Sequence, residues 1–163
     1  MWLTQRFDVR VYGPGWERSA GQLHWNGRPV EGEEFARVCS SASITLGINP
    51  ARAGGGTTYT SDRTWMVILA GAFYLGQWTP GIETFLRGGE HCAWYTDPAD
   101  CARQAEHYLD DSAERERIRR AGEAFVRANH TYDQRIHNLL SGEAWVNPLG
   151  ASSAASADVD RAS

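Results

Sequence analysis

Hydrophobic and polar residues alternate along the first third of the chain with two different periods. Residues 7–12 and 43–48 alternate with a period of two, which is typical of half-buried strands. Between them, residues 33–42 repeat apolar side chains at helical spacing, so the predicted order is strand, helix, strand. In the second strand, the side chains expected to face the core are Ile44, Leu46 and Ile48.

The middle of the chain continues the same alternation with shorter elements. Ser61 is placed to cap a helix that runs to about residue 70, where Gly71 ends it. Residues 72–75 and 91–95 are typical of short buried strands, and residues 81–86 predict a short helix between them. These elements extend the strand–helix order that the first third began.

Three helices with recognisable start signals close the sequence. Asp97 followed by Pro98 predicts an N-cap and a first helical turn, and the helix should run to about Leu109. Residues 112–129 carry one apolar stripe, and their outer face pairs Glu116 with Arg120 and Glu123 with Arg127 at i,i+4. Thr131 and Gln134 fit a capping box that opens the last helix, with apolar positions Ile136, Leu139 and Leu140.

The alternation of strands and helices predicts an α/β domain with a mainly parallel sheet. We expect this domain to occupy residues 1–146. Residues 147–163 are rich in Ala, Ser and Asp without apolar periodicity, so we expect a disordered tail.

Composition excludes several classes of protein. All 16 basic residues are Arg, so lysine Schiff-base chemistry and a Walker-type phosphate loop are excluded. Against 20 acidic residues they leave a net charge of −4, which offers no general attraction for nucleic acid. The longest apolar run, residues 65–75, is too short to span a membrane, and the first residues lack a secretion signal. We therefore expect a cytoplasmic location.

Cysteine and histidine spacing gives no metal site. Cys39, Cys92 and Cys101 are odd in number and lie inside apolar patterns, which favours buried thiols over a disulfide framework or a zinc site. The five histidines are scattered, and none pairs with another at helical ligand spacing. Gly13-Pro14-Gly15 begins like a dinucleotide fingerprint, but Arg18 stands where the third glycine belongs, so we interpret the segment as a turn.

The strongest local chemistry lies between Asn49 and Arg63. A glycine- and hydroxyl-rich loop follows a strand and leads into the helix that Ser61 caps, and Arg63 adds a positive charge in its first turn. Helix amides and the helix dipole favour a phosphate there, and glycine lets the backbone approach it. An anion site and a flexible loop before a capped helix are equally consistent with these residues. Glu83 follows a later strand at the same sheet edge and is by itself a surface glutamate.

Several segments in order resemble the C-terminal, donor-binding domain of GT-B-fold glycosyltransferases, with the CgeB-like spore-protein group as the nearest match. The similarity covers about residues 7–140. The motifs that carry it are Tyr12-Gly13-Pro14-Gly15-Trp16, Ser61-Asp62-Arg63-Thr64-Trp65, Ala70-Gly71-Ala72-Phe73, Gly81-Ile82-Glu83, Tyr95-Thr96-Asp97, Ala121-Gly122 and His130-Thr131-Tyr132-Asp133-Gln134-Arg135.

The resemblance implies a Rossmann-like three-layer domain, half of a GT-B fold, that binds a nucleotide-sugar at the carboxyl edge of its sheet. It implies no cofactor and no metal beyond that donor. It also implies a partner, an N-terminal acceptor-binding domain or subunit. By position, the residues near the diphosphate are Gly55, Gly56, Thr57, Thr58, Ser61 and Arg63, and those near the sugar or phosphate are Gly81 and Glu83.

Two departures from the family pattern temper this expectation. Met66 stands where the family has an acidic residue that holds the ribose, and a thioether is a weak acceptor. An acceptor domain and a first, central strand of the Rossmann order are not recognisable, so we expect the isolated chain to be marginally stable or to need a partner.

No residue can be assigned as a catalytic base from the sequence. The two alternatives to a glycosyltransferase are therefore a non-catalytic nucleotide-sugar-binding or regulatory module on the same fold, and an α/β interaction domain without a nucleotide site.

Overall fold

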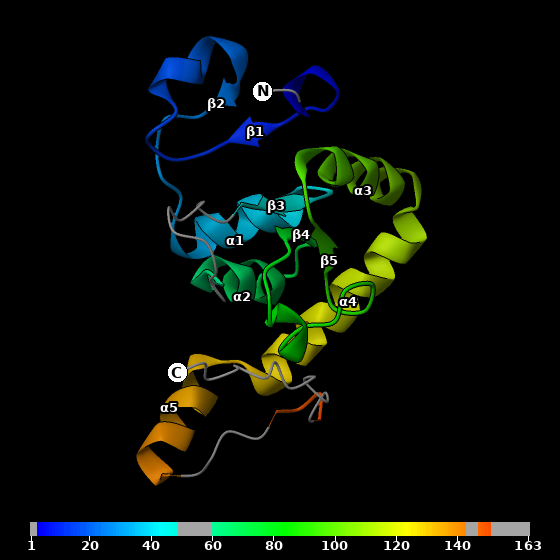
Figure 1. The fold of residues 1–163 in the computed structure, drawn as a ribbon. Helices are drawn as coiled ribbons and strands as arrows, with labels where there is room; N and C mark the ends of the chain where they lie inside the picture. The colour runs from blue at the N-terminus through cyan, green and yellow to red at the C-terminus, as the bar shows by residue number, and fades with distance from the viewer. Residues whose placement is uncertain (1–2, 49–59, 143–146, 151–163) are drawn as a thin grey trace, which may run out of the picture.

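Three parallel strands form the central sheet of the protein. The computed structural model describes residues 3–48, 60–142 and 147–150. The strands β3 (Thr45–Gly47), β4 (Tyr74–Gln77) and β5 (Ala93–Tyr95) lie in the order β3-β4-β5 (Figure 1). Leu46 pairs with Leu75, and Leu75 with Ala93, so apolar residues lie opposite one another across the sheet.

Helices precede, connect and follow these strands. Helix α1 (Gly32–Ser41) precedes β3, and α2 (Asp62–Leu69) connects β3 to β4. A short 3-10 helix, η3 (Ile82–Thr84), lies between β4 and β5. The last part of the chain is helical, with α3 (Pro98–Asp110), α4 (Ser112–Asn129) and α5 (Tyr132–Ser141). This mixed α/β arrangement with parallel strands is the predicted fold class, and it is consistent with a Rossmann-like half of a GT-B fold.

The predicted helix caps are present in the structure. Ser61 accepts a hydrogen bond from the backbone amide of Arg63, and Asp97 accepts one from the amide of Asp100. Thr131 and Gln134 form the reciprocal capping box at the start of α5. Side-chain oxygens satisfy amides that a helix leaves without internal partners, so these short polar signals fix where the helices begin.

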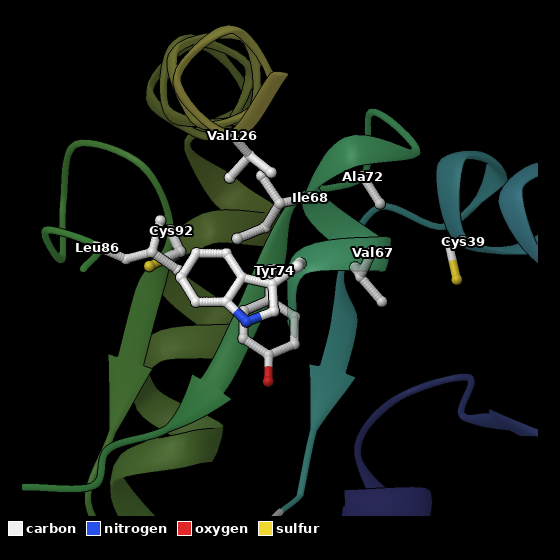
Figure 2. Packing of buried hydrophobic residues seen from close by; sticks show 9 residues of the cluster. Cys39, Val67, Ile68, Ala72, Tyr74, Leu86, Cys92 and Val126 are labelled. Atoms are coloured by element: carbon white, nitrogen blue, oxygen red, sulfur yellow. The ribbon is translucent and has the colours of Figure 1, made fainter. Parts of the chain in front are cut away.

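The two faces of the sheet bury two hydrophobic clusters, which gives the domain its layers. One face meets α1, α2 and α4 through residues that include Cys39, Ile68, Tyr74 and Val126 (Figure 2). The other face meets α3 and the first half of α4 through Phe73, Leu75, Ala93, Tyr95, Cys101, Tyr108 and Ile118. The sheet therefore lies between two helical layers, and α4 is long enough to contribute to both.

A second, smaller sheet lies in the N-terminal part of the chain. Strands β1 (Arg10–Val11) and β2 (His24–Trp25) pair in parallel. The 3-10 helices η1 (Leu3–Gln5) and η2 (Glu17–Gln22) precede and separate them. Leu3 packs against the cluster on the α3 face, and Arg6 forms an ion pair with Glu106 of α3, so these contacts join this part to the rest.

Some sequence expectations differ from the structure at the ends of elements. The strand expected over residues 7–12 is present only as β1, and β2 was not predicted. The strand expected at residues 72–75 starts two residues later, and the short helix at 81–86 is the 3-10 turn η3. Ile48 was expected in the core but is 56% exposed, because β3 ends at Gly47.

The apolar face predicted for the last helix is not buried. Leu139 and Leu140 of α5 are 80% and 81% exposed, and α5 buries none of its residues. Leu109, at the end of α3, is also exposed. Periodicity identified these as helices, but it did not determine what their apolar residues contact.

Other expectations are confirmed. Cys39, Cys92 and Cys101 are buried free thiols. Burial raises the pKa of the Cys92 thiol well above its ordinary value and that of Cys101 to about 11. The predicted pairs of α4 are formed, Glu116 with Arg120 at 2.6 Å and Glu123 with Arg127 at 3.0 Å.

The segment Gly13-Pro14-Gly15 is a turn, with φ of 95° at Gly13 and 94° at Gly15. Both glycines therefore occupy the left-handed region that other residues rarely adopt. The helix that follows Gly15 is the short 3-10 helix η2, which begins at Glu17, and not the α-helix that a dinucleotide fingerprint would require.

Candidate functional site

The N-terminus of α2 lies at the carboxyl edge of the central sheet, because α2 follows strand β3. This is the edge at which open parallel sheets bind ligands. Ser61 begins the helix, and its side-chain oxygen lies 3.3 Å from the amide nitrogen of Arg63. The amide of Thr64 donates to the carbonyl oxygen of Ser61 at 2.9 Å. The sequence predicted this helix start correctly.

The first turn of α2 exposes one side chain of each charge. Arg63 and Asp62 are both exposed. In the part of the chain that the structure describes, no ion pair joins Arg63 to a carboxylate. The guanidinium can therefore accept an anionic ligand without first breaking an ion pair, whereas Asp62 opposes an anion at the same turn.

Of the other predicted site residues, only Gly81 and Glu83 lie within the described residues. Gly81 has a φ of 87°, and its carbonyl oxygen accepts a hydrogen bond from the Thr84 hydroxyl at 2.7 Å. The backbone at the start of η3 therefore requires glycine at position 81, because other residues rarely adopt this left-handed conformation. Glu83 is exposed on that turn. Gly55, Gly56, Thr57 and Thr58 lie outside the described residues.

The structure does not link the two halves of the predicted site directly. Between residues 60 and 142, no hydrogen bond or ion pair joins Gly81 or Glu83 to Ser61 or Arg63. Neighbouring residues of the two elements are in contact, since the rings of Trp65 and Phe85 lie edge to face with their centroids 6.2 Å apart. Among the described residues, the structure therefore places Ser61 and Arg63 on α2, and Gly81 and Glu83 on the separate turn at η3, without a direct bond between the two pairs.

Buried hydroxyl groups connect the start of α2 to the ends of the strands. The Tyr74 hydroxyl of β4 lies 3.0 Å from the Thr64 hydroxyl of α2. The Tyr95 hydroxyl of β5 donates to the carbonyl oxygen of Gly47, the last residue of β3, at 2.8 Å. In Figure 2 the Tyr74 hydroxyl points in the direction of the strand arrowheads, toward the carboxyl edge.

Burial changes the pKa values of both tyrosine hydroxyl groups. Burial raises the pKa of Tyr74, while its hydrogen bond with Thr64 and the nearby charge of Arg63 oppose the rise. Burial also raises the pKa of Tyr95. Both phenols are therefore neutral hydrogen-bonding groups at physiological pH.

A shallow pocket of about 50 Å³ lies beside the candidate anion site, between α2 and α5. Arg135 of α5 lies over the Trp65 ring at 5.1 Å, and the buried His130 ring lies 4.6 Å from the same indole. Burial, followed by the charges of Arg135 and His91, lowers the pKa of His130 to about 4. The residues that line the pocket are Asp62, Trp65, Met66, Leu69, His130, Thr131, Tyr132 and Arg135.

This pocket brings together motifs that are far apart in the sequence. The segment 61–65 and the segment 130–135 each contributed to the family resemblance, and they line one surface in the structure. Met66, which replaces the ribose-binding acid of the family pattern, is 45% exposed on the same surface.

Sequence reasoning did not identify the tyrosine hydroxyl groups as part of the candidate site. One signal was present, because Gly47 and Gly76 interrupt strands that are otherwise rich in apolar residues. A glycine inside a strand marks a position where another group approaches the backbone closely. Here that group is the ring of Tyr74.

Two kinds of feature are absent from the described residues. No group of three or more His, Cys, Asp or Glu side chains in this part of the chain is arranged to hold a metal ion. No helix among the same residues is both long enough and apolar enough to cross a membrane.

Comparison with known proteins adds the family. No curated protein and no solved structure gives a significant match to the chain. Residues 2–141 match the family described as glycosyl transferase-like. This range includes the central sheet, the α2 site and the last helix, and it is most of the 163 residues. The chain therefore belongs to the glycosyl transferase-like family.

Proposed function

We propose that this chain is the donor-binding domain of a GT-B-type glycosyltransferase of the CgeB-like group. Its substrate would be a nucleotide-diphospho-sugar, from which the glycosyl group passes to an acceptor. The single observation that carries the proposal is the family match over residues 2–141. The parallel sheet with the α2 N-terminus at its carboxyl edge supports it, because this arrangement suits a bound diphosphate.

In this proposal the start of α2 binds the diphosphate. Arg63, Ser61 and the first amides of the helix would face the phosphates, and the loop residues Gly55, Gly56, Thr57 and Thr58 would surround them. Gly81 and Glu83 would lie near the sugar or the phosphate. When the bond between the sugar and the diphosphate breaks, negative charge develops on the leaving group. Donors already aimed at that position stabilise the charge without reorganising.

Two adjacent charges allow a sharp test of the anion site. Arg63→Ala should weaken the binding of uridine, guanosine or thymidine diphosphate by about threefold to tenfold, because an exposed charged hydrogen bond is lost. Asp62→Asn should strengthen it, because a carboxylate is removed from the same turn. Isothermal titration calorimetry and thermal shift on the 163-residue chain measure both effects.

The matched control is Arg103→Ala, which removes an exposed arginine from α3 on the other side of the sheet. It should leave nucleotide affinity unchanged. Equal losses in Arg63→Ala and Arg103→Ala would show that only net charge matters, and would contradict a site at α2. Absence of binding to all three diphosphates would favour an α/β interaction domain without a nucleotide site.

A non-catalytic nucleotide-sugar-binding or regulatory module is the second candidate function, and Met66 favours it. The side chain is exposed on the pocket surface and offers no strong acceptor for a ribose hydroxyl. The two candidates differ in turnover. A glycosyltransferase domain transfers sugar when an acceptor-binding domain is supplied, whereas a binding module retains the donor without consuming it.

A further inference from the structure

The hydroxyl groups of two buried tyrosines reach the carboxyl edge of the sheet, and the proposed function does not use them directly. Tyr74 is 4% exposed and Tyr95 is 6% exposed, and they come from the adjacent strands β4 and β5. Their hydroxyl groups reach different partners, Thr64 on α2 and Gly47 at the end of β3. One hydrogen bond therefore joins β4 to the start of α2, and the other joins β5 to the end of β3, from the two opposite faces of the sheet.

The backbone is shaped to admit the Tyr74 ring. A Cβ atom on Gly47 would lie 2.0 Å from the Tyr74 hydroxyl oxygen, and one on Gly76 would lie 2.4 Å from its Cε1 atom. Neither glycine has a positive φ, so the reason for glycine at these positions is space. Both β3 and β4 therefore have glycine where the Tyr74 side chain lies beside them. A side chain at either position would clash with Tyr74.

A purely apolar core would not need these hydroxyl groups. Burying a hydroxyl costs free energy unless it is hydrogen-bonded, and phenylalanine would fill nearly the same volume without that cost. The hydrogen bond between the Tyr74 and Thr64 hydroxyl groups instead orients α2 relative to β4, because a hydrogen bond is favourable only over a narrow range of distances and angles. Thr60, just before the helix, extends the connection, since its hydroxyl lies 3.4 Å from that of Thr64.

We propose that Tyr74 and Tyr95 are positioning residues for the diphosphate site. The Tyr74 hydrogen bond holds the first turn of α2 against β4, and the Tyr95 hydrogen bond holds the end of β3 against β5. Both strand ends and the helix start are then fixed, so that Arg63 and the helix amides converge on one anion. This inference rests on the proposed function, because it names residues that act through the same site. Neither tyrosine touches the ligand in this arrangement, and each acts through α2 or β3.

The test compares Tyr74→Phe with Tyr108→Phe on the full chain. Tyr108 is also buried, at 6% exposed, but it lies on α3 and packs against Phe73 on the other face of the sheet. Tyr74→Phe should lower the affinity for uridine diphosphate by about threefold to tenfold, the effect of one hydrogen bond. Tyr108→Phe should leave that affinity unchanged. Calorimetric titration gives the affinity, and urea unfolding gives the stability of each variant.

A double variant separates positioning from stability. Tyr74→Phe leaves the Thr64 hydroxyl buried without its partner on β4, and adding Thr64→Val removes that second polar group. Replacing both partners by apolar groups can be nearly neutral for stability. The double variant should therefore recover stability relative to Tyr74→Phe, but its affinity for uridine diphosphate should stay low.

The outcomes separate the inference from the proposed function. If the wild-type chain binds none of the nucleoside diphosphates, the proposed function is wrong and the inference fails with it. If the wild type binds uridine diphosphate and Tyr74→Phe binds it equally well, only the inference is wrong. Affinity that returns together with stability in the double variant would also overturn it, because the tyrosine would then be a structural residue alone.

Discussion

Buried polar side chains determine the local chemistry of this protein at the scale of single residues. His130 is 4% exposed at the start of α5, and its ring lies against Trp65 and Phe125. Burial, Arg135 and His91 lower its pKa to about 4. The neutral imidazole is therefore the form that fits the folded protein, and protonation favours unfolding.

Acid should destabilise the fold through His130. Its pKa is near 6.5 when unfolded and about 4 when folded, so its contribution is complete above pH 6.5 and is lost as the pH falls toward 4. The linkage relation gives a loss of about 2 kcal/mol between pH 8 and pH 5. Urea unfolding of wild type and His130→Phe across this range measures it. The variant should depend on pH less steeply, and identical slopes would contradict this role.

Met66 is the position at which this chain departs from the family pattern, and its substitution tests whether the pocket receives the ribose. If the pocket beside α2 receives the ribose, Met66→Glu supplies the acceptor that the family pattern has and this chain lacks. We expect nucleoside diphosphate affinity to rise by roughly threefold to tenfold, the effect of about one added hydrogen bond at a partly exposed position. Calorimetric titration measures it. Met66→Gln is the uncharged control, and a fall in affinity with Glu but not Gln would place the diphosphate, rather than the ribose, next to residue 66.

At the scale of elements, close packing of α4 fixes the helical layer against the sheet. Gly122 of α4 lies so near the segment before β5 that an added Cβ would be 2.0 Å from the carbonyl oxygen of His91. The His91 ring stacks on Phe125 of the same helix, with ring centroids 4.1 Å apart. Arg119 of α4 also donates to the carbonyl oxygen of Gly71 at 2.9 Å, which links α4 to the turn after α2.

Gly122→Ala should therefore destabilise the protein although alanine is the better helix former. The clash involves a backbone oxygen that cannot rotate away, so we expect a loss of roughly 1–3 kcal/mol, the usual range for overpacking. Gly21→Ala is the control, since a Cβ there meets nothing within 4 Å and the φ angle is not positive. Chemical denaturation of both variants measures the effect. Equal stability would mean that α4 lies farther from the β5 segment than the structure shows.

At the scale of the whole molecule, the N-terminal part and the central sheet differ in burial. None of the side chains described between residues 3 and 31 is buried, whereas the central sheet buries most of its residues on both faces. The pair β1–β2 forms a separate two-stranded sheet, and isolated two-stranded pairs are marginal in water. The amide of Thr45 donates to the carbonyl oxygen of Phe73, the residue before β4, so the amide of Leu46 faces the side of β3 on which no described strand lies.

Hydrogen exchange should show this difference directly. Amides of β1 and β2 should exchange through openings of lower free energy than those of β4, since few buried contacts hold the N-terminal part in place. Mass spectrometry of peptides from residues 8–28 and 72–78 measures the two rates under native conditions. Equal protection of the two sheets would show that they open as one cooperative unit.

Local signals in the sequence were sufficient for much of the fold. Strand alternation, three helix caps and the stop at Gly71 predicted most elements, because each depends on neighbouring residues. The predicted start of α2, with Ser61 as its cap and Arg63 in the first turn, was also correct. The ends of the strands were less predictable. The apolar pattern continues to Ile48, whereas β3 ends at Gly47, where the Tyr74 ring and the Tyr95 hydroxyl contact the strand.

The sequence alone determined the α/β order, the helix starts and the family of the chain, since these depend on residue type and spacing along the backbone. Only the tertiary structure brought Tyr74, Tyr95 and Gly47 to one edge of the sheet, and the segments 61–65 and 130–135 to one pocket. It also decided that α5 leaves Leu139 and Leu140 exposed while His130 is buried. Contacts between distant segments depend on how the layers pack, and the spacing of residues within a single element does not contain that information.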